Sequence, residues 1–444
     1  MSDFTQNLHF DTLKIRGAYD SNDHNYAVNV PIYQTAAFDF GDEARGERLF
    51  FSEEVGFLYS RIGNPTVDVF ERRIAELHNA AGAVAFSSGI AAITNTLFQV
   101  GAGGEILTTY QLYGGTVDSF KKIYPDYGIQ VKYSEDINNL EIVEKEITEN
   151  TKAIYVESVS NPNTDVADLE GLAEVAHRHG IPLIVDNTLV TPYLLNPFEY
   201  GADIVIYSAT KNLTGHGNVI AGVVVEKGGF DWGNGKFKGF TESHYTLRDR
   251  STGKERSFLE AFPEFPFSAR LRMIGLNLFG ATLGAFDAYL AILGLETLSE
   301  RLEKQQRNVE KLISFLQSNE HVSWVKYPTL REGKQKELAE KYLTKGAGNL
   351  FAFGLKGTEE QKNEFLDSLK LFSFHVNIGD SRSLIVNSPQ TTHSELTDEE
   401  LQKAELGKDL IRVSVGLENA EDLIADLKQS IEKVYDGKTE TSAA

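Results

Sequence analysis

The stretch IPLIVDNTLVTPYLLNPFEYGADIVIYSATKN (181–212) decides the fold class of this 444-residue chain. Two short apolar runs within it, 181–187 and 202–209, are rich in β-branched residues and are typical of buried strands. Similar runs occur at 83–87, 105–109, 153–158 and 221–227, with helical patterns at 90–100, 116–123 and 168–180. Because these strands lack clean polar–apolar alternation and are separated by helices, they indicate a parallel sheet that is covered on both faces.

The rest of the chain is arranged around this α/β domain, which we place at residues 66–268. Residues 1–65 are polar and rich in turn formers, so we expect an arm that lies on another surface. Residues 228–268 are Gly-rich, aromatic and then charged, which predicts a long surface excursion. A smaller α+β domain is expected over 269–444, from a helical stretch at about 270–318, strand-like runs at 350–357 and 410–418, and helical patterns at 396–406 and 420–435.

Composition excludes several classes of protein. Hydrophobic residues make up 41% and charged residues 24% of the chain, which is typical of a globular protein. The chain has no cysteine, so it forms no disulfide framework, cysteine zinc site or iron–sulfur cluster. A net charge of −21 disfavours nucleic acid as a partner. Since no signal peptide and no run of 18 apolar residues is present, we expect no membrane partner and a cytoplasmic location.

Polar side chains follow three of the predicted strands. SSG (87–89) lies between a strand and a helix, where hydroxyls and backbone amides can bind a phosphate dianion. Asp186 ends one strand, and Lys211 follows the next between the hydroxyls of Ser208 and Thr210. Taken singly, these are better explained by a capping turn, a turn-forming aspartate and an exposed loop lysine. Together they are the components of a pyridoxal phosphate (PLP) site, where a lysine binds the cofactor and an aspartate pairs with the ring nitrogen.

Two other motifs point away from alternative chemistry. GAGGEI (101–106) begins like a dinucleotide fingerprint, but Ile106 stands where the third glycine belongs and a strand follows, which disfavours a nicotinamide-dependent oxidoreductase. HRHG (177–180) places two histidines on different faces of a helix, so they cannot chelate a metal together, and no metal site is expected. The role of His216 in TGHGN stays open.

Eight motifs in order make the chain similar to the Cys/Met-metabolism family of PLP-dependent enzymes. They are YSRIGNPT (59–66), SSGIAA (87–92), YGGT (113–116), ESVSNP (157–162), VDNT (185–188), YSATKNLTGHG (207–217), GLETLSER (294–301) and IRVSVGLE (411–418). The resemblance covers roughly residues 10–435. It implies an α/β, aspartate-aminotransferase-like PLP-dependent transferase fold, with a large, mostly parallel-sheet domain and a smaller C-terminal α+β domain.

The resemblance also implies roles for individual residues that would bind PLP. Lys211 would carry the cofactor and act as the catalytic base, and Asp186 would hold the ring nitrogen protonated. Tyr113 would stack on the ring and help to deprotonate the incoming amino group. The other implied cofactor-binding residues are Tyr59 and Arg61 of a neighbouring subunit, Ser88, Gly89, Ile90, Asn161, Thr188, Ser208 and Thr210.

For the substrate, the resemblance implies that Arg412 binds the α-carboxylate, because a guanidinium fork matches a carboxylate in two places. Asn377 and Ser383 are further substrate-binding candidates. Since Tyr59 and Arg61 would complete a neighbour's site, the implied assembly is a homo-oligomer, a tetramer built as a dimer of dimers.

Within the family, the chain is most similar to the O-acetylhomoserine sulfhydrylases. Its length, the insertion at about 228–268, and NIGDSRSL (377–384) followed by Thr391-Thr392-His393 carry this similarity. The implied reaction is a γ-replacement that converts O-acetyl-L-homoserine and sulfide or methanethiol to homocysteine or methionine, with release of acetate. Cystathionine γ-synthase, cystathionine γ-lyase, methionine γ-lyase and a catalytically silent relative stay alternatives, and the acyl group of the donor is left open.

Overall fold

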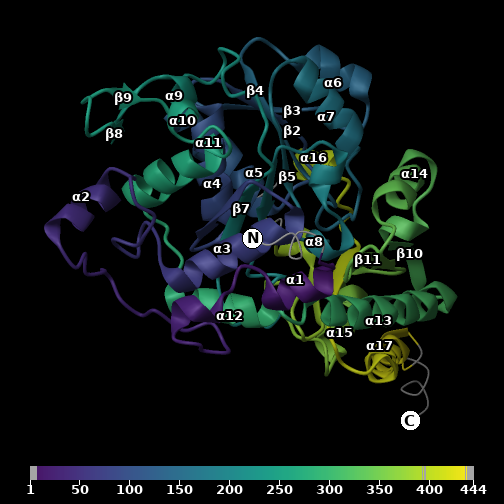
Figure 1. Ribbon diagram of the computed structural model, residues 1–444. Coiled ribbons are helices and arrows are strands. Elements are labelled where there is room, and N and C mark those ends of the chain that lie inside the picture. The colour runs from purple at the N-terminus through teal and green to yellow at the C-terminus, as the bar shows by residue number, and fades with distance from the viewer. Residues whose placement is uncertain (1–7, 393, 395–396, 436, 438–444) are drawn as a thin grey trace.

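The computed structural model describes residues 8–435 and 437, apart from 393, 395 and 396. Its centre is a seven-stranded sheet with the strand order β1-β7-β6-β5-β4-β2-β3 (Figure 1). The strands are β1 (Gly82–Phe86), β2 (Glu105–Thr108), β3 (Gln130–Tyr133), β4 (Thr151–Glu157), β5 (Leu183–Asp186), β6 (Ile204–Tyr207) and β7 (Gly222–Glu226). Strands β2 to β6 pair in parallel, whereas β7 is antiparallel to both of its neighbours.

The predicted run 221–227 is therefore a strand but not a parallel one. No helix lies among residues 208–221 between β6 and β7, so the chain makes no crossover and returns in the opposite direction. The sequence analysis also missed β3, whose four residues are all at least partly exposed. The predicted α/β fold with a large, mostly parallel sheet is confirmed.

Both faces of the sheet are buried because alternate residues of each strand point to opposite sides. On β5, Leu183 and Val185 join one apolar core, while Ile184 joins the other. The first face is covered by α3 (Pro65–His78) and α7 (Leu169–Arg178), and the second by α4 (Gly89–Gly101) and α5 (Gly114–Lys122). This two-sided burial explains why the strand sequences are apolar throughout.

A second, antiparallel sheet of four strands forms the smaller C-terminal part, in the order β10-β11-β13-β12. Its strands are β10 (Val322–Lys326), β11 (Leu350–Leu355), β12 (Leu384–Asn387) and β13 (Leu410–Ser414). Helices in this part are α13 (Leu298–Ser318), α14 (Gly333–Tyr342), α15 (Glu359–Ser368), α16 (Asp398–Lys403) and α17 (Ala420–Tyr435). The sequence analysis found β11 and β13 but missed β10 and β12.

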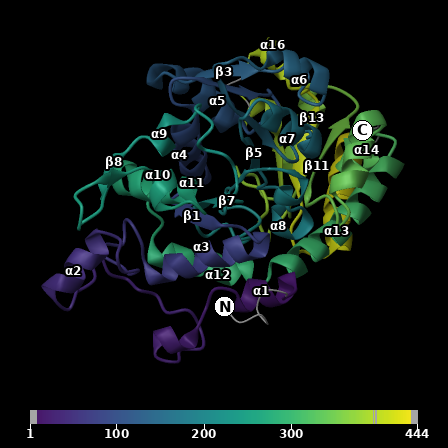
Figure 2. The ribbon, with the colours of Figure 1, turned by 45° about the horizontal axis from the view of Figure 1, so that its top comes forward.

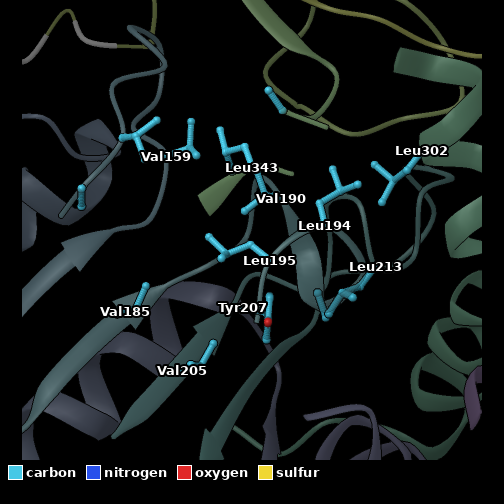
Figure 3. Close-up of a cluster of buried hydrophobic side chains, with 14 of the residues drawn as sticks. Val159, Val185, Val190, Leu194, Leu195, Val205, Tyr207, Leu213, Leu302 and Leu343 are labelled. Carbon is cyan, nitrogen blue, oxygen red and sulfur yellow. The ribbon is translucent and has the colours of Figure 1, made fainter. Parts of the chain in front are cut away.

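One apolar core runs through both parts of the molecule. Figure 3 shows side chains of β5, β6 and α8 (Thr191–Leu194) beside Leu302 of α13 and Leu343, which follows α14. The predicted helical stretch at 270–318 is interrupted: a π-helix (Leu271–Phe279) ends at Gly280, with φ of +80°, and α12 (Ala285–Leu295) precedes α13. The π-helix and α12 pack on α4 and α3, so the start of the predicted C-terminal domain lies against the large sheet's helices.

The N-terminal arm divides into two parts. Helix α1 (Phe10–Arg16) packs on α3, and its buried Lys14 donates to Glu300 of α13 at 2.7 and 2.8 Å. The following segment, which carries α2 (Glu43–Phe50), stands away from the body in both ribbon views (Figures 1 and 2). Of the predicted arm, only the segment that carries α2 extends away from the body, as expected for a segment that packs on another surface.

The segment 228–268 is not the surface excursion that its composition predicts. Trp232 is 1% exposed and packs nearly parallel to both Phe240 and Phe267, with ring centroids at 4.3 and 5.4 Å. Its helices are α9 (Lys238–Thr241), α10 (Phe258–Ala261) and α11 (Pro266–Arg270). The more exposed part is the hairpin of β8 (His244–Arg248) and β9 (Glu255–Arg256), which projects in Figure 1. Aromatic residues in an insertion can thus anchor it to the core.

No helix among the described residues combines the length and the apolar character that a membrane span requires.

The buried indole predicts a large loss of stability in Trp232→Ala. Because the truncation leaves a cavity beside the rings of Phe240 and Phe267, we expect the free energy of unfolding to fall by about 3–5 kcal/mol. Denaturant unfolding followed by circular dichroism measures the change. Tyr245→Ala, at a 64%-exposed tyrosine of the same insertion, is the matched control and should change stability by less than about 0.5 kcal/mol. Equal effects of both variants would contradict a packed insertion.

Candidate active site

A cavity of about 920 Å³ opens where β4, β5 and β6 end. Ligands of open α/β sheets gather at this edge because polar loop groups converge there. Of the residues that the sequence predicts for the site, the cavity lining contains Ser88, Gly89, Ile90, Tyr113, Asn161, Asp186, Thr188, Ser208, Thr210, Lys211, Asn377 and Arg412. The structure therefore brings together side chains that are spread over more than 300 positions of the chain.

The predicted phosphate cradle lies at the N-terminus of α4. Ser88 caps this helix, since its Oγ accepts a hydrogen bond from Ala91 N at 3.1 Å. A Cβ at Gly89 would come within 2.5 Å of the Ser208 Cβ, so only glycine lets Ser208 approach the helix. Helix N-termini carry partial positive charge and are suited to bind anions, and the side chain of Ser208 lies beside this first turn.

Asp186, the last residue of β5, lies at the inner wall of the cavity. Its Oδ1 accepts a hydrogen bond from Thr188 N at 3.0 Å, and Tyr155 OH lies 3.5 Å from its Oδ2. Burial raises the pKa of Asp186, which the bonds from Thr188 oppose. A buried carboxylate of this kind is stabilised by a cationic partner such as a protonated ring nitrogen.

Lys211 lies four residues after β6, and its Nζ donates to Asn377 Oδ1 at 2.8 Å. Burial, reinforced by the nearby guanidinium of Arg412, lowers the pKa of Lys211 to about 8. A neutral amine is a nucleophile and a base, whereas an ammonium is neither. Lys211 is therefore suited to attack a carbonyl group and to accept a proton.

Arg412 comes from β13 of the C-terminal sheet and is 2% exposed. Its two terminal nitrogens donate to Asn161 Oδ1 and to the Asn377 carbonyl oxygen, each at 3.1 Å, while its Nε is buried without a hydrogen-bond partner among the described residues. Burial lowers its pKa to about 10, against the influence of Tyr113. Within the part of the chain that the structure describes, no carboxylate pairs with Arg412, so it can bind the carboxylate of a ligand.

The sequence analysis missed Glu157, which also lines the cavity. This glutamate ends β4 and is the register neighbour of Asp186 on β5. Burial, together with the charge of Asp186, raises its pKa well above the usual range. A signal was present, because Glu157 opens the quoted motif ESVSNP and ends a strand just as Asp186 does.

Three predicted site residues lie outside this cavity. Ser383 is fully buried, donates to Glu418 Oε2 at 2.8 Å and accepts from Gly416 N at 2.8 Å, so its hydroxyl is used within the C-terminal part. Tyr59 and Arg61 line a separate hollow of about 450 Å³ beside residues 281–285, with the guanidinium 5.2 Å from the tyrosine ring centroid.

The other sequence candidates are also placed. Thr210 lines the cavity, and its hydroxyl bonds to the backbone of Ala221.

The described histidines that the sequence analysis singled out do not form a metal site. His177 pairs with Asp203, and His179 pairs with Glu144. Among the described residues, no group of three or more His, Cys, Asp or Glu side chains could hold a metal. His216 is exposed and bonds to the Thr214 carbonyl, and His393 lies outside the described residues.

The lowered pKa of Lys211 predicts how its amine reacts in the cofactor-free protein. Reductive methylation by formaldehyde, followed by mass spectrometry, should increase through about pH 8 and level off above it, because only the neutral amine reacts. Exposed lysines should continue to gain reactivity up to about pH 10. Arg412→Gln should move the midpoint upward, since it removes the adjacent cation. A wild-type midpoint near that of the exposed lysines would contradict the prediction.

Comparisons with known proteins identify the family of this chain. A profile of the family described as "Cys/Met metabolism PLP-dependent enzyme" matches residues 11–432. Sulfhydrylase FUB7 of Gibberella moniliformis is 41% identical over 433 residues, which cover 96% of this chain and 98% of that protein. The homocysteine synthase of Schizosaccharomyces pombe is 42% identical over 430 residues, with coverage of 96% and 98%.

A solved structure has the same fold. The crystal structure of a Campylobacter jejuni protein named as an O-acetylhomoserine (thiol)-lyase, in which a lysine carries pyridoxyl monophosphate, superimposes with a TM-score of 0.90. It is 37% identical, and the match covers 96% of this chain and 100% of that chain. The cradle at α4, the buried Asp186 and the reactive Lys211 fit such a cofactor. This chain belongs to the Cys/Met metabolism family of PLP-dependent enzymes.

Proposed function

We propose that the enzyme catalyses a γ-replacement in which O-acetyl-L-homoserine and sulfide give L-homocysteine and acetate. The observation that carries this proposal is the meeting of Lys211, Asp186 and Arg412 in one cavity. Lys211 and Asp186 are suited to bind the cofactor, and Arg412 is suited to bind the carboxylate of an amino-acid substrate in the same cavity. The relatives named for sulfhydrylation, for homocysteine synthesis and for O-acetylhomoserine support the same donor and product.

When bound, PLP withdraws electrons and so stabilises negative charge on the carbon atoms next to the substrate's amino group. We assign its attachment to Lys211, its ring nitrogen to Asp186, and its phosphate to the cradle of Ser88, Gly89, Ile90 and Ser208. We assign Tyr113 to one face of the ring and Asn161 to its edge. Thr188 supports Asp186 through its backbone N–H.

Lys211 moves the protons in this proposal. Its amine would take the proton from Cα of the substrate and give that proton up to the bound cofactor, which frees the amine to take a second proton from Cβ. Acetate would then leave from Cγ, hydrosulfide would add there, and the amine would return the protons to Cβ and Cα. One base can serve both carbons because they are adjacent, and a pKa of about 8 lets it accept and return protons near neutral pH. The amide oxygen of Asn377 supplies a hydrogen-bond acceptor for the amine.

Arg412 holds the α-carboxylate. Asn161 Oδ1 and the Asn377 carbonyl oxygen each accept from one terminal nitrogen of Arg412, which fixes the plane of its guanidinium. The partnerless Nε adds a buried donor that a carboxylate can satisfy. Fixing this end of the substrate holds Cα near Lys211. Because binding already orients the substrate, less entropy is lost on going from the bound substrate to the transition state.

The charges of the cavity favour a neutral acyl group on the donor. In the lining that the structure describes, Lys211 and Arg412 are the Lys and Arg residues, and both already have roles. Of the other acidic residues there, Asp380 is paired with Arg382 at 2.8 Å, whereas Asp287 would repel the second negative charge of a succinyl or phosphoryl donor. Acetylhomoserine has no such charge.

A homo-oligomer, a tetramer built as a dimer of dimers, is part of the proposal, with Tyr59 and Arg61 completing a neighbour's cavity. Both residues face a hollow apart from their own chain's Lys211 cavity, and the segment with α2 stands away from the body (Figure 2). In this segment Phe50 is 66% exposed. The insertion supports the segment with α2, because Arg250 of the hairpin pairs with Glu47 and Glu53.

A cytoplasmic location stays a prediction from the sequence.

Product analysis with different donors tests the proposed reaction. With O-acetyl-L-homoserine, release of acetate and formation of homocysteine should depend on sulfide, and O-succinyl-L-homoserine should react with a kcat/KM at least about tenfold lower. Methanethiol in place of sulfide shows whether methionine is also formed. Lys211→Ala should abolish both turnover and the borohydride-reducible attachment of PLP. Formation of cystathionine from cysteine, with no sulfide-dependent product, would contradict the proposal.

Mixing of two inactive variants tests the shared site. Subunits with Arg61→Ala keep Lys211, and subunits with Lys211→Ala keep Arg61, so a mixed dimer has one complete site. Random pairing should restore about a quarter of the wild-type activity. Lys211→Ala mixed with the Arg61→Ala/Lys211→Ala double variant is the control and should stay inactive. Absence of recovery, with mixed dimers seen by native mass spectrometry, would show that the site is not shared.

A further inference from the structure

Glu157 is a buried cavity residue to which the proposed reaction assigns no role. It lies at the end of β4 and is 9% exposed. Its Oε1 accepts a hydrogen bond from Tyr113 N at 2.6 Å, and its Oε2 accepts one from Asn161 N at 3.1 Å. One side chain therefore holds two loops that are 48 residues apart in sequence.

We propose that Glu157 is a positioning residue whose single carboxylate sets the backbone of Tyr113 and of Asn161, and through them the two residues that flank the cofactor ring. This inference rests on the ring contacts proposed above for Tyr113 and Asn161. It extends to the substrate, because Asn161 Oδ1 in turn accepts a hydrogen bond from Arg412 at 3.1 Å. A connection of hydrogen bonds thus runs from the large sheet to β13 of the C-terminal sheet.

The backbone N–H of Tyr113 depends on this bond, whereas its carbonyl oxygen accepts from Thr116 N at 2.9 Å and from Val117 N at 3.2 Å in the first turn of α5. Tyr113 precedes α5 as the N-cap residue, yet its side chain makes no capping hydrogen bond and is 44% exposed. The carboxylate of Glu157 therefore supplies an acceptor at the point where α5 begins.

Two backbone N–H groups require two acceptor oxygens on one side chain. A glutamine has the same shape, but it presents one oxygen and one NH₂ group. Its NH₂ would face a backbone N–H, and one of the two donors would be left buried without an acceptor. Glu157→Gln therefore removes one of the two contacts at nearly constant volume.

The chain contains a matched control at Glu226. This glutamate ends β7, is 3% exposed, and also accepts two backbone hydrogen bonds, from Phe267 N at 3.2 Å and from Ser268 N at 2.7 Å. It lies outside the cavity lining. Glu226→Gln thus makes the same chemical change at a buried strand end with no link to Tyr113 or Asn161.

The test compares both Gln variants with the wild type in four measurements: PLP binding to the cofactor-free protein, visible circular dichroism of the bound cofactor, KM and kcat for O-acetyl-L-homoserine, and hydrogen exchange by mass spectrometry. We expect E157Q to raise the Kd for PLP and the KM by about tenfold each, the effect of one lost buried contact. Its circular dichroism band should change, and peptides with Tyr113 and Asn161 should exchange faster. We expect E226Q to lower the melting temperature and to speed hydrogen exchange in peptides with Phe267 and Ser268, while PLP binding, circular dichroism, KM, kcat and the exchange of peptides with Tyr113 and Asn161 stay as in the wild type.

Wild-type PLP affinity and circular dichroism in E157Q would overturn the inference, as would the same changes in E226Q. Glu157→Asp, which is one methylene shorter and cannot reach both N–H groups, should act in the same direction and serves if E157Q does not fold. Tyr113→Ala and Asn161→Ala separate the two proposals. If they weaken PLP binding but E157Q does not, the inference about Glu157 fails alone; if they too leave it unchanged, the proposed ring contacts fail.

Discussion

The parallel pairing of β4, β5 and β6 is the constraint on which the site depends. In this register Glu157 lies beside Asp186, and Asp186 lies beside Ile206, so three strand ends meet at one edge. Alternate residues of β5 pack into two different apolar cores, so a slip by one residue would send each side chain into the other core and disrupt the packing there. The polar groups that follow the strands therefore share one cavity.

The continuous apolar core extends this constraint to the C-terminal part. Leu302 and Leu343 pack with side chains of β5, β6 and α8, which holds the second sheet against the first (Figure 3). Arg412 on β13 can then reach the cavity, where Asn161 and Asn377 each supply an oxygen atom. Without this docking, the group that binds the substrate carboxylate and the base that moves its protons would not be neighbours.

Burial of charge gives the cavity its chemistry. Burying an ionised group without a counter-ion destabilises the charged form, so the pKa of Lys211 falls while those of Asp186 and Glu157 rise. The net charge of −21 is carried by the whole chain and does not decide these values. Residues that would be strongly solvated on the surface become reactive here because apolar packing excludes water from them.

The sequence by itself determined the strands of the large sheet other than β3, the order of its polar ends and the resemblance to the family, since β-branched runs, Asp186, Lys211 and the turn at 87–89 are local signals. It placed twelve of the fifteen candidate residues in the cavity, because motifs at strand ends converge once the sheet is parallel. Only the tertiary structure decided the direction of β7, the anchoring of the insertion by Trp232, the use of Ser383 within the C-terminal part and the contacts of Glu157. All four features depend on contacts between residues that are distant in the chain. A hydrogen bond to a backbone N–H, such as the two that Glu157 accepts, places no requirement on the type of the donor residue, so it leaves no pattern in the sequence.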